Sequence, residues 1–236
     1  MTMHDSPGTD RVRTPSEGVF FADGLVTLYC GSADQVLAGM PAGSVDCIVT
    51  SPPYYGLRDY QIEGQTERAR EGEAAYIGIK VNSIVDETLI DALYRASQAG
   101  VPVDLWVRGI CTVKAGVPGL SENIRVRSIL GRFLEHSRLF WFANGGQPRV
   151  GLGSTDLMHR NLDRRVEVLV SITNPRHIGQ IEEWFDMAFD EGTASWWLEP
   201  NGWTQRTADA EGEPLLDMQE ALIQAVSARR TPERSA

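Results

Sequence analysis

The chain has 236 residues, 42% of them hydrophobic, and its 22 lysines and arginines against 32 aspartates and glutamates give a net charge of −10. This length and composition suit one large globular domain or two small ones, and no apolar run approaches the roughly 18 residues needed to span a bilayer. Its cysteines, Cys30, Cys47 and Cys111, form no CxxC pair, which excludes a disulfide framework, predicts no metal site and indicates reduced thiols in the cytoplasm.

The first part of the chain predicts a leader followed by a short strand–helix–strand pattern. Residues 1–18 lack the apolar core of a signal peptide and are predicted to be disordered. Leu25–Tyr29 and Val45–Val49 are short apolar runs typical of strands, and the segment Ala33–Gly39 between them is compatible with a helix.

A charged segment, Ile62–Ala75, separates this pattern from the rest of the chain. It has few apolar residues and indicates a linker or an exposed helix end. We therefore expect a domain boundary near Gln65/Thr66, with a first fragment at 19–65 and a second domain at 66–228.

The second domain begins with a predicted βαβ unit. Tyr76–Val81 and Val103–Val107 are strand candidates, and Asp86 is placed to cap the N-terminus of a helix that Gly100 would end. A strand–helix–strand unit of this kind favours a parallel or mixed sheet.

Periodicity predicts the remaining elements and an α/β fold overall. They are strands at Phe133–Phe142 and Arg165–Ile172, one apolar helical face within 181–189, a hairpin around Pro200-Asn201-Gly202, a closing helix at Leu215–Ala228 and a frayed tail at 229–236.

Arginines gather around one histidine in the middle of this acidic chain. Residues 101–165 carry ten basic and five acidic side chains, a balance of +5, whereas 166–236 carry five basic and thirteen acidic, a balance of −8. Arg125, Arg127, Arg132 and Arg138 surround His136, a combination suited to binding phosphates and moving a phosphoryl group or a proton. The acidic surroundings disfavour nucleic acid as the partner.

Three segments of the second domain closely resemble the C-terminal region of polyphosphate kinase. They are KVNSIVDETLIDALYRASQAGV, DLWVRGICTVKAGVPGLSENIRVRSILGRFLEHSR and GSTDLMHRNLDRRVEVLV. The resemblance implies a phospholipase D-like mixed sheet with flanking helices and an enzyme that reversibly transfers the γ-phosphoryl group of ATP to polyphosphate. It also implies that Arg108 and His136 contact ATP.

The same resemblance limits what the chain does alone. The family's phosphohistidine and its Mg²⁺-binding residues belong to a preceding domain, so the chain is expected to supply one wall of the active site and to be inactive by itself. The partners implied are ATP or ADP with Mg²⁺, inorganic polyphosphate, and a second copy of the chain or a complementing kinase fragment.

The residue chemistry agrees with these roles but leaves alternatives. His136 could stabilise the transferring phosphoryl group or act as a general acid, or it could be a hydrogen-bonded structural histidine. Arg125 and Arg127 could add phosphate contacts, or they could belong to a solvated strand face. The apolar run Leu139–Phe142 is expected to be exposed on a domain-facing surface and to promote dimerisation or aggregation.

Residues 19–65 resemble the start of a DNA amino-methyltransferase. The resemblance rests on VTLYCGSADQVLAGMPAGSVDCIVTSPPYYGLRDY, in which Ser51, Pro52, Pro53 and Tyr54 follow an apolar strand. Two prolines stiffen a loop, and a tyrosine can stack on a flipped base. The glycine-rich loop that would bind S-adenosylmethionine is absent, and the motif could instead be a simple turn.

These observations leave three readings of function. The first is a polyphosphate kinase fragment fused to a truncated methyltransferase-like fragment, and we interpret the chain as such a fusion. The alternatives are a DNA adenine or cytosine amino-methyltransferase, which would use S-adenosylmethionine, and a non-catalytic phosphate-binding remnant.

Overall fold

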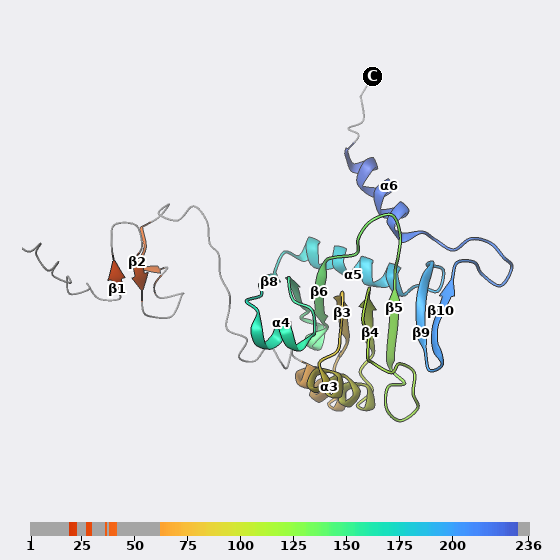
Figure 1. Cartoon of the computed structure of the whole chain (residues 1–236), viewed down its shortest axis with the longest axis horizontal. Coiled ribbons are helices and arrows are strands. Elements are labelled where there is room, and N and C mark those ends of the chain that lie inside the picture. The colour runs from red at the N-terminus through yellow and green to blue at the C-terminus, as the bar shows by residue number, and fades with distance from the viewer. Residues whose placement is uncertain (1–18, 23–26, 30–35, 37, 42–61, 231–236) are drawn as a thin grey trace, which may run out of the picture. The chain divides into compact units, whose positions relative to one another are not determined.

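The computed structural model describes residues 19–22, 27–29, 36, 38–41 and 62–230 (Figure 1). The chain divides into two compact units at Val49/Thr50. In the first unit, β1 (Val19–Ala22) and β2 (Thr27–Tyr29) pair antiparallel, so the strand predicted at 25–29 overlaps β2.

Several expectations for this region lie outside the described residues. They are the leader at 1–18, the strand at Val45–Val49, most of the helix at Ala33–Gly39 and the Ser51–Tyr54 motif.

The second unit is built on one eight-stranded mixed sheet, which confirms the predicted α/β class. Its strand order is β10-β9-β5-β4-β3-β6-β7-β8, with β3, β4 and β5 parallel and the other pairs antiparallel. The strands are β3 (Ile77–Val81), β4 (Val103–Val107), β5 (Ile124–Ser128), β6 (Arg138–Phe142), β7 (Arg149–Gly153), β8 (Leu169–Ile172), β9 (Ser195–Glu199) and β10 (Gly202–Arg206).

Helices flank this sheet, as expected from the sequence. They are α2 (Ile62–Arg70), α3 (Glu87–Gln98), α4 (His159–Arg164), α5 (Pro175–Phe189) and α6 (Met218–Arg230), with a short 3-10 helix at Asn144–Gly146. The tail predicted to fray from residue 229 therefore starts inside α6, which continues to Arg230.

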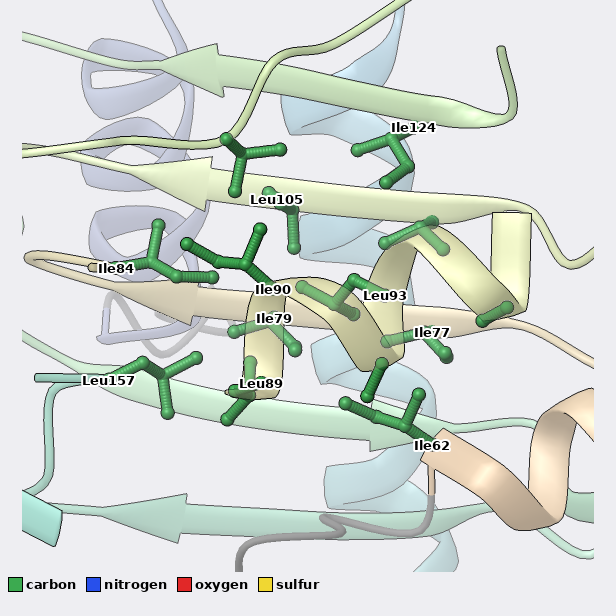
Figure 2. Packing of buried hydrophobic residues seen from close by; sticks show 14 of the residues in the cluster. Ile62, Ile77, Ile79, Ile84, Leu89, Ile90, Leu93, Leu105, Ile124 and Leu157 are labelled. Carbon is green, nitrogen blue, oxygen red and sulfur yellow. The ribbon is translucent and has the colours of Figure 1, made fainter. Parts of the chain in front are cut away.

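The predicted βαβ unit is confirmed by β3, α3 and β4. The Asp86 carboxylate accepts a hydrogen bond from the Leu89 N–H at 3.0 Å and so caps the N-terminus of α3. Gly100 follows the helix with a φ of 86°, a left-handed conformation that favours glycine. Alternate apolar residues of the strands face α3, and Figure 2 shows Ile79 and Leu105 meeting Leu93 of the helix.

A second hydrophobic cluster lies between the opposite face of the sheet and α5. Trp106 and Trp141 both pack edge-on against Phe185 of α5, with ring centroids 6.3 Å and 6.1 Å apart. The run Leu139–Phe142 forms β6, and all four of its side chains are buried. The expectation that this run is exposed was therefore wrong, because a central strand of a sheet covered on both faces buries successive residues on alternate sides.

The predicted boundary at Gln65/Thr66 falls inside α2, and α2 packs against the second unit. Ile62 is fully buried and belongs to the core around α3. The Gln65 side-chain oxygen accepts hydrogen bonds from the backbone N–H groups of Tyr76 and Asn144. Ile62 thus packs in the same core as α3, and the segment interpreted as a linker or an exposed helix end contains α2.

Two strands begin later in the chain than the sequence predicted. The strand expected at Phe133–Phe142 begins only at Arg138, because the preceding residues form an exposed loop, and the strand expected at Arg165–Ile172 begins at Leu169. The helix within 181–189 and the hairpin around Pro200-Asn201-Gly202 are confirmed as α5 and β9–β10, whereas β5 and β7 were not predicted.

Candidate functional site

Polar side chains gather at one edge of the sheet, where β3, β4 and β7 end and β6 begins. The parallel pairing of β3 with β4 and the antiparallel pairing of β6 with β3 and β7 bring these four termini together. The side chains that they contribute form what we call the edge cluster: Lys80, Asn82, Arg108, Glu135, Arg138 and Asp156. In parallel sheets, the carboxyl ends of strands are a usual place for ligand sites.

Asp156 is the centre of the edge cluster. It is buried and accepts hydrogen bonds from the backbone N–H groups of Asn82, at 2.7 Å, and Ser83, at 3.3 Å. Its two oxygens also accept from Nε and Nη2 of Arg138, at 3.3 Å and 3.0 Å. Burial alone would raise the pKa of Asp156, but the hydrogen bonds from Arg138 and Asn82 hold its pKa below the usual value.

Arg108, one of the predicted ATP contacts, is held in place by a hydrogen bond from its Nε atom. Its Nε donates to Oδ1 of Asn82 at 2.9 Å, and Asn82 is in turn bound to Asp156. The half-buried Arg108 forms no ion pair with a carboxylate in the part of the chain that the structure describes. The terminal nitrogens of its guanidinium are therefore available to an anion.

An open pocket of about 610 Å³ lies beside Arg108. Its lining consists of Arg108, Gly109 and the loop residues 129–135 that follow β5, and it includes the exposed Arg132. Two arginines and one carboxylate, Glu135, face this pocket, and Glu135 is engaged by Lys80 at 2.9 Å. The balance of charge in the pocket thus favours an anionic ligand.

His136 lies next to this pocket in sequence, at the end of the same loop. Its side chain is exposed, and its backbone carbonyl accepts a hydrogen bond from Nη1 of Arg138 at 2.8 Å. Within the described residues, its imidazole makes no hydrogen bond, and its role stays a prediction. Arg138 links the backbone of His136 to Asp156, so the edge cluster positions both predicted ATP contacts.

Lys80 is a member of the edge cluster that sequence reasoning missed. Its side chain is only 3% exposed, and its Nζ donates to Oγ of Ser137 at 2.7 Å and lies 4.6 Å from the ring centroid of Trp106. Burial lowers the pKa of Lys80, Glu135 opposes this shift, and the nearby Arg108 and Arg138 add to it. A lysine inside the apolar strand IGIKV was the available signal.

Arg125 and Arg127 lie on β5 and have protein partners. Arg125 forms a bidentate pair with Asp104, with both N–O distances at 2.7 Å. Arg127 is buried, donates from Nη1 to the carbonyls of Ala188 and Asp190 at the end of α5, and stacks on Trp197. These contacts give Arg127 a helix-capping role, and we do not include either arginine in the candidate site.

The described residues offer no group of three or more histidine, cysteine, aspartate or glutamate side chains that could bind a metal ion. Among the same residues, no helix is long and apolar enough to cross a membrane.

Cys111 is unpaired and half-buried, and burial raises the pKa of its thiol to about 11, which disfavours a reactive thiolate.

Residues 57–219 match the family described as polyphosphate kinase C-terminal domain 2. A polyphosphate kinase from Streptomyces coelicolor is 58% identical over 171 residues, which are 72% of this chain and 23% of that protein. One from Neisseria meningitidis serogroup B is 42% identical over 218 residues, 91% of this chain and 32% of that protein. The chain thus spans about a quarter to a third of the length of these relatives.

A solved structure gives the same result. The polyphosphate kinase from Porphyromonas gingivalis superposes with a TM-score of 0.69 and 29% identity, covering 83% of this chain and 30% of that one. A phospholipase D family member, Nuc from Salmonella typhimurium, aligns with a TM-score of 0.38 and 14% identity, too weakly to support an argument.

Proposed function

Because the chain belongs to the polyphosphate kinase family, we propose that it forms one wall of an active site that reversibly transfers the γ-phosphoryl group of ATP to polyphosphate. The edge cluster and the pocket beside Arg108 would hold the phosphates. Since the chain corresponds to only part of its relatives, we expect phosphate binding by this chain and no transfer by it alone.

The observation that carries this proposal is that the Arg108 guanidinium is anchored by Asn82 but is not paired with a carboxylate among the described residues. Its Nε donates to Asn82, and its side chain lines the pocket. An anchored guanidinium with free terminal N–H groups is arranged to bind two oxygens of a phosphate. Phosphoryl transfer needs such fixed positive charge on the non-bridging oxygens.

His136 would act on the same phosphates. Arg138 fixes the backbone of His136, and the imidazole itself is exposed. The side chain can therefore turn toward a phosphoryl group bound in the neighbouring pocket. A protonated imidazole can donate a proton to the leaving oxygen or stabilise the charge on the transferring group.

ATP would reach this pocket as its Mg²⁺ complex. As the family resemblance implies, the ion would be bound by the phosphates and by residues of a preceding domain. The Mg²⁺ would neutralise phosphate charge, while Arg108 and His136 bind and orient the phosphates from their side.

The other readings carry less support. None of the similarities reported above concerns a DNA methyltransferase, and Ser51, Pro52, Pro53 and Tyr54 lie outside the described residues. The phosphate-binding remnant shares the Arg108 pocket and differs only in lacking transfer. A cytoplasmic location, and assembly with a second copy or a complementing kinase fragment, belong to the proposal.

Titration calorimetry with Mg·ATP and with tripolyphosphate tests this function. Arg108→Ala should weaken binding about 10- to 100-fold, because one charge-assisted contact contributes about 1.5–3 kcal/mol. Arg176→Ala removes an exposed arginine at the start of α5 and should bind as the wild type does. Failure of the folded wild-type chain to bind either ligand would sink the proposal.

Assays with γ-labelled ATP separate the kinase from the remnant. Labelled polymer formed with a complementing kinase fragment, and lost in His136→Ala, supports the kinase, whereas binding without any transfer supports the remnant. Photo-crosslinking to S-adenosylmethionine would instead favour the methyltransferase.

A further inference from the structure

The loop that lines the Arg108 pocket has little hydrophobic anchoring of its own. Residues 130–134 are exposed, and the large apolar side chains of Leu130, Phe133 and Leu134 are 63%, 56% and 66% exposed. Burial of apolar area is the main force that fixes loops in proteins, and it acts weakly on these residues. Some other contact must hold the loop in place.

That contact comes from α6, which lies 86 residues further along the chain. Oε1 of Gln219 accepts from the Phe133 backbone N–H at 2.8 Å, and Nε2 of Gln219 donates to the Phe133 carbonyl at 2.9 Å. The side-chain amide thus pairs with both backbone polar groups of Phe133, as a residue of a neighbouring strand would. Figure 1 shows the loop after β5 reaching the first turn of α6.

The second N–H of the same amide goes to the edge cluster. Nε2 of Gln219 also donates to Oε1 of Glu135 at 2.7 Å, while Oε2 of Glu135 pairs with Nζ of Lys80. Gln219 is only 5% exposed, and both its nitrogen and its oxygen are engaged. A buried amide with every polar atom satisfied has one well-defined position.

Gly131 shows how closely the loop passes over this amide. A Cβ atom at position 131 would lie 2.5 Å from Oε1 and 2.8 Å from Cδ of Gln219. A larger residue at position 131 would have to displace this amide and disturb its three hydrogen bonds. The start of α6 is also anchored to the core, because Met218, next to Gln219, is buried in the same hydrophobic cluster as Ile129.

From this geometry we infer that Gln219 is a positioning residue that holds the phosphate-binding loop against the edge cluster. It touches no substrate in this arrangement and acts through Phe133 and Glu135. The inference rests on the proposed function, since it assigns to α6 the task of shaping the pocket in which Arg108 and Arg132 bind phosphates.

The test compares Gln219→Ala with a matched control on the same helix, Gln224→Ala, in the full chain. Gln224 is exposed, and among the described residues its side chain hydrogen-bonds to Glu220, at 3.3 Å. Gln219→Ala should bind Mg·ATP and tripolyphosphate about 10-fold more weakly, and Gln224→Ala should bind as the wild type does. Equal affinity of Gln219→Ala and the wild type would overturn the inference and leave the proposed function standing.

Gln219→Glu distinguishes positioning from a general loss of stability. The new carboxylate would face Glu135 at about the same distance, and Lys80 can pair with only part of this charge, so the loop should be displaced at pH 7. At pH 5 the two carboxylates can share a proton, and affinity relative to the wild type at the same pH should recover. An equal deficit at both pH values counts against the inference.

Hydrogen exchange without ligand separates this inference from the proposed function. In Gln219→Ala the Phe133 amide should exchange faster than in the wild type, while amides of β3 and β4 keep their protection. If the wild type binds neither ligand, the proposed function is overturned. Exchange at Phe133 then decides the inference: faster exchange upholds the positioning of the loop, and unchanged exchange overturns it.

Discussion

Replacing Asp156 with asparagine tests the edge cluster at its centre. Asparagine has nearly the same shape, so Oδ1 can still accept from the Asn82 backbone N–H. Its amide nitrogen, however, is a donor, and it would face the donors of Arg138. The change therefore removes a charge and an acceptor while it leaves the packing unchanged.

The size of the effect follows from the burial of the ion pair. The Arg138 and Asp156 side chains are 12% and 6% exposed, and their closest N–O distance is 3.0 Å. Removing one partner of a buried pair costs about 3–5 kcal/mol, and we expect about 3 kcal/mol because water reaches part of Arg138. For a domain of this size, the melting temperature should fall by about 6–12 °C.

Urea unfolding at pH 7 measures this loss, with Asp91→Asn, an exposed aspartate of α3, as the matched control. A loss under about 0.5 kcal/mol in Asp156→Asn, within the range of ordinary surface changes, would refute the reasoning. The pH dependence gives a second check. Since the folded-state pKa of Asp156 is lowered, its contribution is complete above about pH 4 and is lost as the pH falls through that pKa. In Asp156→Asn, the free energy of unfolding should lack the part that is lost on acidification.

Three further changes test the fold and the exclusion of Arg127 from the site. Ile62→Ala should destabilise the domain by about 2–5 kcal/mol, because α2 contributes to the core; a neutral result would place the domain start after α2. Asp86→Ala should cost about 1 kcal/mol through loss of the α3 cap, as measured by urea unfolding. Arg127→Met should destabilise by about 2–3 kcal/mol, since it uncaps α5, yet calorimetry should show unchanged affinity for tripolyphosphate. A drop in affinity would return Arg127 to the site.

The part of the fold that could be predicted is the part with local signals. The βαβ unit of β3, α3 and β4 carries apolar runs, an aspartate cap and a glycine stop within thirty-one residues, Ile77–Val107. The hairpin of β9 and β10 carries its own turn residues. Such signals act over a few residues and survive without knowledge of the rest of the chain.

The missed elements depend on distant neighbours. In β5 the sequence IRVRS is typical of a half-solvated strand, but Arg127 is buried because the carbonyls at the end of α5 and Trp197 cover it. Asp156 likewise lies in a loop with no helical or strand periodicity. Its role arises from Asn82 and Arg138, which are 74 and 18 residues away.

The arrangement of the edge cluster explains why binding and transfer should separate in this chain. One carboxylate, Asp156, fixes Arg108 through Asn82 and the His136 backbone through Arg138, so both groups are held by contacts inside this domain. Gln219 holds the intervening loop through Phe133. A wall preorganised by its own core needs no second domain to bind a phosphate. Under the proposed function, transfer also needs a nucleophile and a metal site, which the family resemblance assigns to a preceding domain.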